Sequence, residues 1–362
     1  MATVAFAVEP RALLPPPHSV PQPARPRTSI VLVSFNSGGA LLRCLATIDQ
    51  EVEAVSEIVI VNHGDPGPEL EIAARSRRVR VITPERNLGF GAGCNTGAEV
   101  ATGEVVVFLN PDTIAMPGSI TELVDTLDDE TVGIAMARVR LLREPELLNS
   151  RGNVVHISGL GWSGGFGDLV DDAVDVREVA SPCGAAMAVR RDEFLALGGF
   201  REELFLYYED QDLGWRMRMT GRRIVMNCRA DVYHEFEFDR HERKRYFLER
   251  NRLAFVLIDF SLRTILVLLP VLLATELSMM LLAWRQGWLR EKLAGSLWCV
   301  GNLRLLLTLR WRTQRLRSVP DRQLVQALTP VIDPRAVPVP ALVRLVINPL
   351  LSGYWTLAQR VI

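Results

Sequence analysis

The sequence predicts an α/β protein with a doubly wound sheet, and three observations indicate this fold. Continuous β-branched runs, typical of buried parallel strands, occur at residues 29–35, 57–61 and 79–82. The first two runs end in polar, glycine-containing turns, and a helical leucine pattern at residues 41–48 follows the first. Because strand, turn and helix repeat in this order, we expect right-handed crossovers between parallel strands.

Composition and charge exclude several classes of protein. The 362 residues are enough for one large domain with an appendage, or for two domains. The formal net charge of −1 gives no indication of a nucleic-acid partner. The five cysteines form no CxxC pair, so we expect neither a zinc site nor a disulfide framework, and a reducing compartment. Residues 1–27 are rich in proline and lack the regions of a signal peptide, which predicts a disordered arm.

A carboxylate follows the next apolar run, at residues 105–109. This run leads into the turn of residues 110–112, which ends in Asp112. A buried strand with an acid at its carboxyl end builds a metal or ligand site in the crevice of an open α/β sheet. Asn36 and Asn62 end the first two strands, so we expect them at the same edge, where a nucleotide would lie.

A second acidic cluster, residues 209–212, follows an aromatic segment, and His234 comes after a β-like stretch. A carboxylate that holds a cation, a second that acts as base, and a histidine ligand are the parts of a metal-assisted group transfer. We predict Asp210 as the general base, with Glu209 beside it in the catalytic pair. The alternative is a helix N-terminus at which the macrodipole favours acids, and we assign Asp212 to that role.

Two irregular segments have more than one interpretation. The glycine-rich residues 87–97 let backbone amides approach a ligand closely, but such a turn also simply caps a helix. Residues 150–176, which surround Trp162, are predicted to form a long loop that acts as a lid or a binding loop. His63 and His156 have no comparable motif around them and are interpreted as loop residues.

The composition changes again after residue 252. Residues 253–284 are strongly apolar and residues 285–322 are rich in arginine. The stretch 264–284 is just long enough to span a bilayer, although Glu276 interrupts it. We expect a helix that lies in the membrane interface, with a spanning helix and an ordinary buried helix as alternatives.

The order of the motifs closely resembles that of the family 2 glycosyltransferases, in particular the bacterial branch with rhamnosyltransferases and galactofuranosyltransferases. The resemblance extends from Ser29 to Phe236. The matching segments are Val33-Ser34-Phe35-Asn36, Asn87-Leu88-Gly89-Phe90 with Asn95, Asn110-Pro111-Asp112, Gly184-Ala185-Ala186-Met187 with Arg190-Arg191, Gly198-Gly199-Phe200, Glu209-Asp210-Gln211-Asp212-Leu213 with Arg216, and His234.

This resemblance implies a GT-A fold, a nucleoside-diphosphate sugar donor, a divalent cation (Mg²⁺ or Mn²⁺) and inversion at the anomeric carbon. Asp112 and His234 would be the metal ligands. The family often carries Asp-x-Asp where this chain begins with Asn110, so Asp112 would be the single carboxylate ligand. The residues expected at the donor are Ser34, Asn36, Asn62, Asn87, Asn95, Asn110, Arg190 and Arg191. For either arginine, a structural role is the alternative.

The predicted parts of the chain are the arm at 1–27, a GT-A domain at 28–252 and a membrane-associated helical region at 253–362. We predict an inverting glycosyltransferase that acts in cell-envelope polysaccharide or glycolipid assembly, on the cytoplasmic face of the cell membrane. The suggested donor is dTDP-rhamnose, with UDP-galactofuranose second, and the expected acceptor is a lipid-linked glycan.

Two other functions stay open at this point. A sugar nucleotidyltransferase would need a basic residue in the turn of residues 34–39, which has none. A non-catalytic nucleotide-sugar-binding membrane scaffold is favoured by asparagine at positions 62 and 110, but the presence of both Asp112 and Asp210 opposes it.

Overall fold

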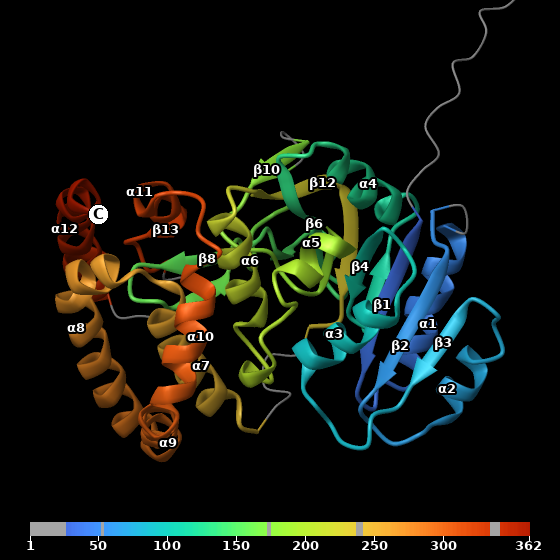
Figure 1. The fold of residues 1–362 in the computed structure, drawn as a ribbon, viewed down its shortest axis with the longest axis horizontal. Coiled ribbons are helices and arrows are strands. Elements are labelled where there is room, and N and C mark those ends of the chain that lie inside the picture. The colour runs from blue at the N-terminus through green and yellow to red at the C-terminus, as the bar shows by residue number, and fades with distance from the viewer. Residues whose placement is uncertain (1–26, 52–53, 172–174, 237–241, 334–340) are drawn as a thin grey trace, which may run out of the picture.

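The computed structural model describes residues 27–51, 54–171, 175–236, 242–333 and 341–362. Its central feature is a ten-stranded mixed sheet with the order β10-β12-β6-β11-β4-β1-β2-β3 (Figure 1). The other two strands lie off this path, where β5 pairs with β12 and β7 pairs with β6. The predicted proline-rich arm, apart from Arg27, lies outside the described residues.

The first half of the sheet is parallel, as predicted. Its strands are β1 (Thr28–Ser34), β2 (Glu57–Asn62), β3 (Val79–Ile82) and β4 (Val105–Leu109). Strand β1 pairs in parallel with β2 on one side and with β4 on the other. Every residue of β1 and β4 is buried because helices cover both faces, which explains their continuous apolar sequences.

The second half of the sheet, for which the sequence predicted no strand directions, is mixed. Strand β11 (Ala186–Arg190) runs antiparallel to β4 and also to β6 (Val132–Leu141). Strand β12 (Arg223–His234) is parallel to β6, and β10 (Val176–Glu178) is antiparallel to β12. Two short strands complete it, β5 (Thr113–Ala115) against β12 and β7 (Leu148–Ser150) against β6.

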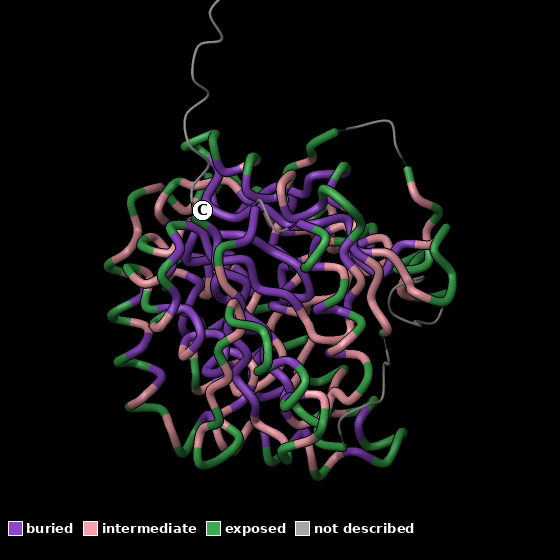
Figure 2. Tube along the Cα trace, turned by 90° about the vertical axis from the view of Figure 1, so that its right-hand side faces the viewer, coloured by how far each residue is buried: buried purple, intermediate pink, exposed green. Residues whose placement is uncertain are grey.

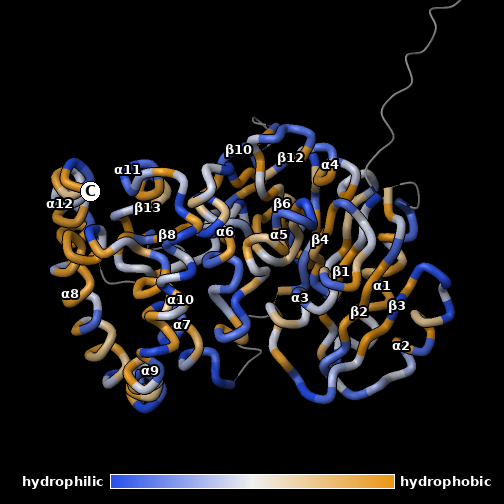
Figure 3. Tube along the Cα trace, viewed as in Figure 1, coloured by the Kyte–Doolittle hydropathy of each residue, from blue (hydrophilic) through white to orange (hydrophobic). Residues whose placement is uncertain are grey.

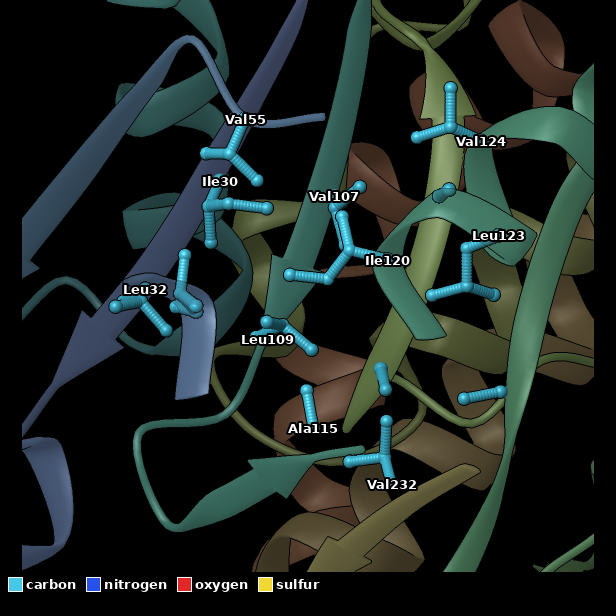
Figure 4. Packing of buried hydrophobic residues seen from close by; sticks show 14 of the residues in the cluster. Ile30, Leu32, Val55, Val107, Leu109, Ala115, Ile120, Leu123, Val124 and Val232 are labelled. Atoms are coloured by element: carbon cyan, nitrogen blue, oxygen red, sulfur yellow. The ribbon is translucent and has the colours of Figure 1, made fainter. Parts of the chain in front are cut away.

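Helices cover the sheet on both faces, and alternate residues of each strand contribute to two separate cores. Ile30 and Leu32 of β1 pack on one face with Ile120 and Leu123 (Figure 4), whereas Val31 packs on the other. Figure 2 shows the buried segments gathered in the interior. The helices of this part are α1 (Gly39–Ile48), α2 (Pro68–Ala73), α3 (Phe90–Val100), α4 (Ser119–Asp125), α5 (Arg191–Ala196) and α6 (Glu209–Met219), with 3-10 turns at Asp49–Glu51, Thr126–Asp128 and Glu202–Leu204.

The predicted loop of residues 150–176 is more ordered than its composition indicates. It contains β8 (Asn153–His156) and β9 (Gly161–Ser163), which form a small sheet with β13 (Leu328–Thr329). Strand β13 comes from the C-terminal region and pairs in parallel with β8. This pairing partner lies so far along the chain that the composition of the loop gave no sign of it.

The C-terminal region is helical and shares a core with the sheet domain. Its helices are α7 (Lys244–Asp259), α8 (Leu262–Gln286), α9 (Leu289–Gly301), α10 (Leu303–Gln314), α11 (Asp321–Leu324) and α12 (Asn348–Val361), with a 3-10 turn at Val325–Ala327 and a π-helical turn at Val343–Ile347. The predicted boundary between residues 252 and 253 falls inside α7. Trp215 of α6 and Phe255 of α7 belong to the same apolar cluster, so α7 packs on both parts.

A buried ion network joins α7, α8 and α9. Lys292 Nζ lies 2.9 Å from Glu249 and 2.6 Å from Glu276, and Arg252 bonds the same two carboxylates. Lys292 is fully buried, so its charge needs these partners. Glu276, the acid that interrupts the apolar sequence of α8, therefore faces the protein interior. Two cations and two carboxylates leave the network with no formal net charge.

Candidate active site

Two cavities meet at the carboxyl edge of the sheet. The larger, of about 540 Å³, is lined by the turns that follow β1, β2 and β4, and we call it the strand-edge cavity. The smaller, of about 300 Å³, is lined by the N-terminus of α6 and by β8 and β9, and we call it the acid cavity. The two cavities adjoin, because six residues line both of them: Phe90, Asn110, Leu206, Tyr207, His234 and Phe236.

Asp112 and His234 come together because β5 and the end of β12 are neighbours. Thr113, the residue after Asp112, pairs directly with His234. Asp112 Oδ1 lies 3.3 Å from His234 Nε2. The other ring nitrogen of His234 lies 3.0 Å from Asn149 Oδ1, which fixes the orientation of the ring. The predicted pair thus occupies one point on the wall of the strand-edge cavity.

The residues present fit a divalent cation whose coordination a ligand would complete. Among the described side chains, no three of His, Cys, Asp or Glu gather at one point. The residues that would hold a cation are Asp112, His234 and Asn110, whose Oδ1 is buried with no hydrogen-bond partner in the described part of the chain. Adjacent ligands of a cation with bonds of about 2.1 Å lie about 3.0 Å apart, close to the Asp112–His234 distance. Carboxylate and amide oxygens with an imidazole nitrogen are donors that a divalent cation can accept.

Asp210 is held rigidly in the acid cavity at the start of α6. Its Oδ2 accepts hydrogen bonds from Asn153 Nδ2 at 2.8 Å and from the Gly184 amide at 3.1 Å, and its Oδ1 accepts from the Gln211 amide at 2.8 Å. Burial raises the pKa of this carboxyl group, while the hydrogen bonds oppose the shift. A raised pKa makes a carboxylate a better proton acceptor near neutral pH.

Glu209 and Asp212 flank Asp210 but lie in opposite environments. Burial, followed by the charge of Asp210, raises the pKa of Glu209 to about 8, so Glu209 is protonated at neutral pH. Burial alone would also raise the pKa of Asp212, but Arg201 at 2.7 Å and Arg216 at 2.5 Å hold it below its usual value. These two arginines, more than the helix macrodipole predicted from the sequence, account for Asp212.

Several predicted donor-side residues lie at the strand-edge cavity. Asn36, Asn87 and Asn110 line it. Ser34 lies just behind the wall, where its hydroxyl donates to that of Ser37 at 3.1 Å. Asn36 has a φ of 51° and accepts a hydrogen bond from the Asp65 amide at 3.0 Å, which ties the turns after β1 and β2 together.

The structure places Asn62 and Asn95 outside both cavities, which corrects their expected donor contact. The Asn62 amide bonds both polar backbone groups of Gly64 and shapes the turn after β2. The Asn95 amide bonds the backbone N–H and carbonyl of Phe200, at 2.7 and 2.8 Å. Both side chains are buried, and these backbone contacts use their hydrogen-bonding groups.

Arg190 and Arg191 lie at the opposite edge of the sheet, which likewise corrects their expected contact with the diphosphate. Because β11 runs antiparallel to β4, Arg190 pairs with Val105 at the start of β4 and not at its end. Its guanidinium donates to the Val132 carbonyl at 2.8 Å. Arg191 donates to the Ala98 carbonyl at 2.8 Å, near the end of α3. Both arginines therefore have a structural role, which was the alternative interpretation in the sequence analysis.

His63 and Asn153 are site residues that the sequence analysis did not predict. His63 lines the strand-edge cavity, its Nε2 is buried with no hydrogen-bond partner among the residues described, and burial lowers its pKa. The sequence did contain a signal for His63, because this residue directly follows β2, and β2 ends at the same edge of the sheet as β4. Asn153 had no such signal, because it reaches Asp210 only through the fold of β8.

Comparisons with known proteins address the family and the fold of the chain. Residues 29–195 match the profile of "Glycosyl transferase family 2". N-acetylglucosaminyl-diphospho-decaprenol L-rhamnosyltransferase of Mycobacterium tuberculosis is 26% identical over 234 residues, which is 57% of this chain and 75% of that protein. Another protein of that species, the uncharacterized protein MT1568, is 29% identical over 225 residues, or 60% of this chain and 68% of its own length.

A solved structure shares the fold. The crystal structure of GalNAc-T7 with UDP, GalNAc and Mn²⁺ superimposes with a TM-score of 0.54 at 16% identity, and the match covers 66% of this chain and 48% of that one. The predicted GT-A fold class is thus confirmed, and so is the resemblance to family 2 glycosyltransferases.

Protonation of Glu209 predicts how the stability of the protein depends on pH. Unfolded Glu209 loses its proton near its ordinary pKa of 4.5, whereas the folded protein keeps it until about pH 8. The folded state therefore binds the extra proton between these values, and this carboxyl lowers stability as the pH rises. Glu209→Gln should remove this dependence of stability on pH. The variant should have a higher free energy of unfolding than wild type, and this gain should be larger at pH 8 than at pH 5 by on the order of 2 kcal/mol.

Urea denaturation at the two pH values measures this difference. Glu71→Gln, which changes an exposed acid of α2, is the control and should leave the pH dependence unchanged. An equal effect of Glu209→Gln at both pH values would mean that Glu209 is ionised in the folded protein.

Proposed function

We propose, for a chain whose residues 29–195 match the model of glycosyltransferase family 2, that its two cavities hold the two substrates of an inverting sugar transfer. The nucleoside-diphosphate sugar occupies the strand-edge cavity and the acceptor hydroxyl enters the acid cavity. The observation that carries this proposal is the junction of the cavities, with the Asp112–His234 pair on one side and Asp210 on the other.

The donor lies along the carboxyl edge of the strands, the usual position of a nucleotide on an open α/β sheet. Asn36, His63 and Asn87 offer polar groups there. Asp112, His234 and Asn110 would hold a divalent cation, which supplies charge neutralisation for the departing diphosphate. The presence of UDP and Mn²⁺ in the related fold of GalNAc-T7 supports this assignment.

Asp210 acts as the general base from the other side of the junction. The acceptor oxygen forms a bond to the anomeric carbon as the bond from that carbon to the diphosphate breaks, and the hydroxyl proton passes to the Asp210 carboxylate. Asn153 and the Gly184 amide hold this carboxylate in place. Attack from the face opposite the diphosphate inverts the anomeric centre. Glu209, which keeps its own proton, does not compete as a base.

A lipid-linked acceptor is the class that best suits the C-terminal region. The relative from M. tuberculosis is named for a decaprenol-linked substrate. Helix α8 is long and apolar enough to cross a bilayer and lies at the end of the molecule opposite β3 (Figures 1 and 3). Its outer face carries leucines spaced three or four residues apart. The exposed ones are Leu262, Leu266, Leu269, Leu273, Leu277 and Leu281.

We propose that α8 lies in the plane of the membrane interface on the cytoplasmic side. Its inner face is bound to the protein through Glu276, which bonds Arg252 and Lys292. Crossing the bilayer would separate these charges and place Glu276 in hydrocarbon, at a high cost in free energy. A wholly buried helix does not fit, because Leu277 is 74% exposed. The exposed arginines 263, 285, 290 and 304 suit anionic headgroups.

Asp210→Asn tests the general base. The amide keeps the size of the side chain but cannot accept the proton, so turnover should fall by roughly two to four orders of magnitude while donor affinity changes little. Release of dTDP or UDP from dTDP-rhamnose or UDP-galactofuranose, with a polyprenyl-diphosphate glycan as acceptor, measures turnover. Glu209→Gln is the matched control and should stay active, since Glu209 is already neutral. The opposite ranking would assign the base to Glu209.

Asp112→Ala tests the cation site. Loss of this carboxylate should abolish transfer and weaken binding of dTDP or UDP in the presence of Mn²⁺, because the diphosphate charge is no longer neutralised. Calorimetric titration of the nucleotide with and without Mn²⁺ gives a readout that does not depend on turnover, and EDTA should reproduce the effect in wild type. Asp65→Ala, which removes an exposed carboxylate nearby, should do neither. Full activity in EDTA would remove the metal from the proposal.

A charged substitution on α8 tests membrane binding. The double variant Leu273→Asp and Leu277→Asp should move the protein from the membrane fraction to the soluble fraction, because apolar burial resists high salt and a charged face cannot provide it. Wild-type protein should need detergent for release. Ile72→Asp alters an exposed apolar residue on α2 and should leave partitioning unchanged. Release of wild type by salt alone would limit the contact to electrostatics.

A further inference from the structure

The loop of residues 204–208 has an unusually strained backbone. In the described chain, four residues other than glycine have a positive φ, and three lie here: Phe205 at 63°, Tyr207 at 67° and Tyr208 at 73°. A bulky aromatic side chain disfavours this region of φ, so each of these residues costs free energy. Such a conformation persists only where the surrounding structure holds it.

This loop occupies the junction of the two cavities. Leu206 and Tyr207 line both of them. On the donor side, the Phe205 carbonyl accepts a hydrogen bond from the Phe90 amide at 2.9 Å. On the acceptor side, the loop runs directly into α6, whose second residue is Asp210. The backbone of the loop therefore sets where the base and the shared wall lie.

One buried side chain of α7 holds most of this backbone. Asn251 is fully buried, and its Nδ2 donates to the carbonyls of Leu204 at 2.9 Å, Leu206 at 2.9 Å and Tyr207 at 2.7 Å. Arg250 Nε donates to Asn251 Oδ1 at 2.8 Å, which turns the NH₂ group toward the loop. The Arg250 guanidinium also donates to the Leu204 carbonyl at 2.6 Å.

Aromatic packing supports the same contact. The ring of Phe247, one turn earlier on α7, stacks on Phe205 with centroids 5.2 Å apart and an interplanar angle of 18°. The Arg250 guanidinium lies over Phe247 at 4.8 Å and over Trp298 of α9 at 4.7 Å. The contacts that hold the loop thus come from α7, and through Trp298 they extend to α9, which packs on α7.

We propose that Asn251, oriented by Arg250, is a positioning residue for the transfer reaction. It holds the strained 204–208 loop in the conformation that places Tyr207 at the junction of the cavities and Asp210 in the acid cavity. This proposal rests on the proposed function. The turns after β1, β2 and β4 form most of the strand-edge cavity, and the loop adds only Phe205, Leu206 and Tyr207 to its wall. Loss of the Asn251 contacts should therefore lower turnover far more than nucleotide affinity.

Asn251→Ala and Asn251→Asp test this role. The first removes the donor group and the second turns a carboxylate oxygen toward three carbonyls. For both, kcat should fall about 10- to 100-fold while the Kd of dTDP or UDP stays within about twofold, since a small misplacement of the base costs rate. Hydrogen exchange of the amides of residues 204–212 should become faster.

The matched control is Asn348→Ala. Asn348 is a buried asparagine of α12 whose amide makes two hydrogen bonds to the backbone of Ile332, at 2.9 and 3.1 Å, and it lines neither cavity. This variant should lose a similar amount of stability, without a change in kcat per folded molecule or in exchange at 204–212. An equal fall in kcat for the control, or unchanged kcat in both Asn251 variants, would overturn the proposal. So would a parallel loss of nucleotide affinity.

A milder variant covers the case in which Asn251 variants do not fold. Phe247→Leu removes the ring that stacks on Phe205 but keeps an apolar side chain. It should lower kcat several-fold with unchanged nucleotide affinity, and unchanged kcat would overturn the proposal. If wild-type protein transfers no sugar at all, the proposed function fails, whereas the exchange rates of residues 204–212 still decide whether Asn251 holds the loop.

Discussion

The structure depends on the placement of strand β12, which brings the distant parts of the site to one sheet edge. Asp231 near the end of β12 bonds Arg138 at 2.7 Å and Arg140 at 2.5 Å, both on the neighbouring strand β6. These bidentate pairs are largely buried, so they fix the strand more firmly than surface ion pairs would. Three residues later, His234 meets the turn that carries Asp112. Asp112 and His234 therefore meet only because this strand is held in register.

The acids of α6 show how one short sequence produces three different groups. Burial raises the pKa of Glu209 to about 8, and two arginines hold the pKa of Asp212 below its usual value. Burial raises the pKa of Asp210 against the opposing effect of its hydrogen bonds. Environments that push neighbouring pKa values apart assign separate roles to residues of the same chemical type. Of the three, only Asp210 is held by hydrogen bonds at the cavity in the geometry that a base needs.

The C-terminal helices serve the site as well as the apolar surface. Their outer face exposes the leucines of α8, while their inner side contributes β13 to the small sheet and Asn251 to the strained loop. The buried network around Lys292 connects these two sides. Under the proposed function, the same group of helices would position both a membrane-bound acceptor and the catalytic base, and the C-terminal region would be part of the active site.

The sequence alone determined the features that depend on local pattern. Buried parallel strands require continuous apolar runs and end in polar turns, so β1, β2 and β4 and the position of Asp112 could be predicted from residues close in the chain. Only the tertiary structure decided the rest, since it depends on pairing between distant segments. The antiparallel course of β11 moved Arg190 and Arg191 away from the site, and the fold of β8 brought Asn153 to Asp210. No local pattern encodes which strand lies beside which. For this reason the sequence predicted the candidate site residues more completely than it predicted the contacts that hold them in place.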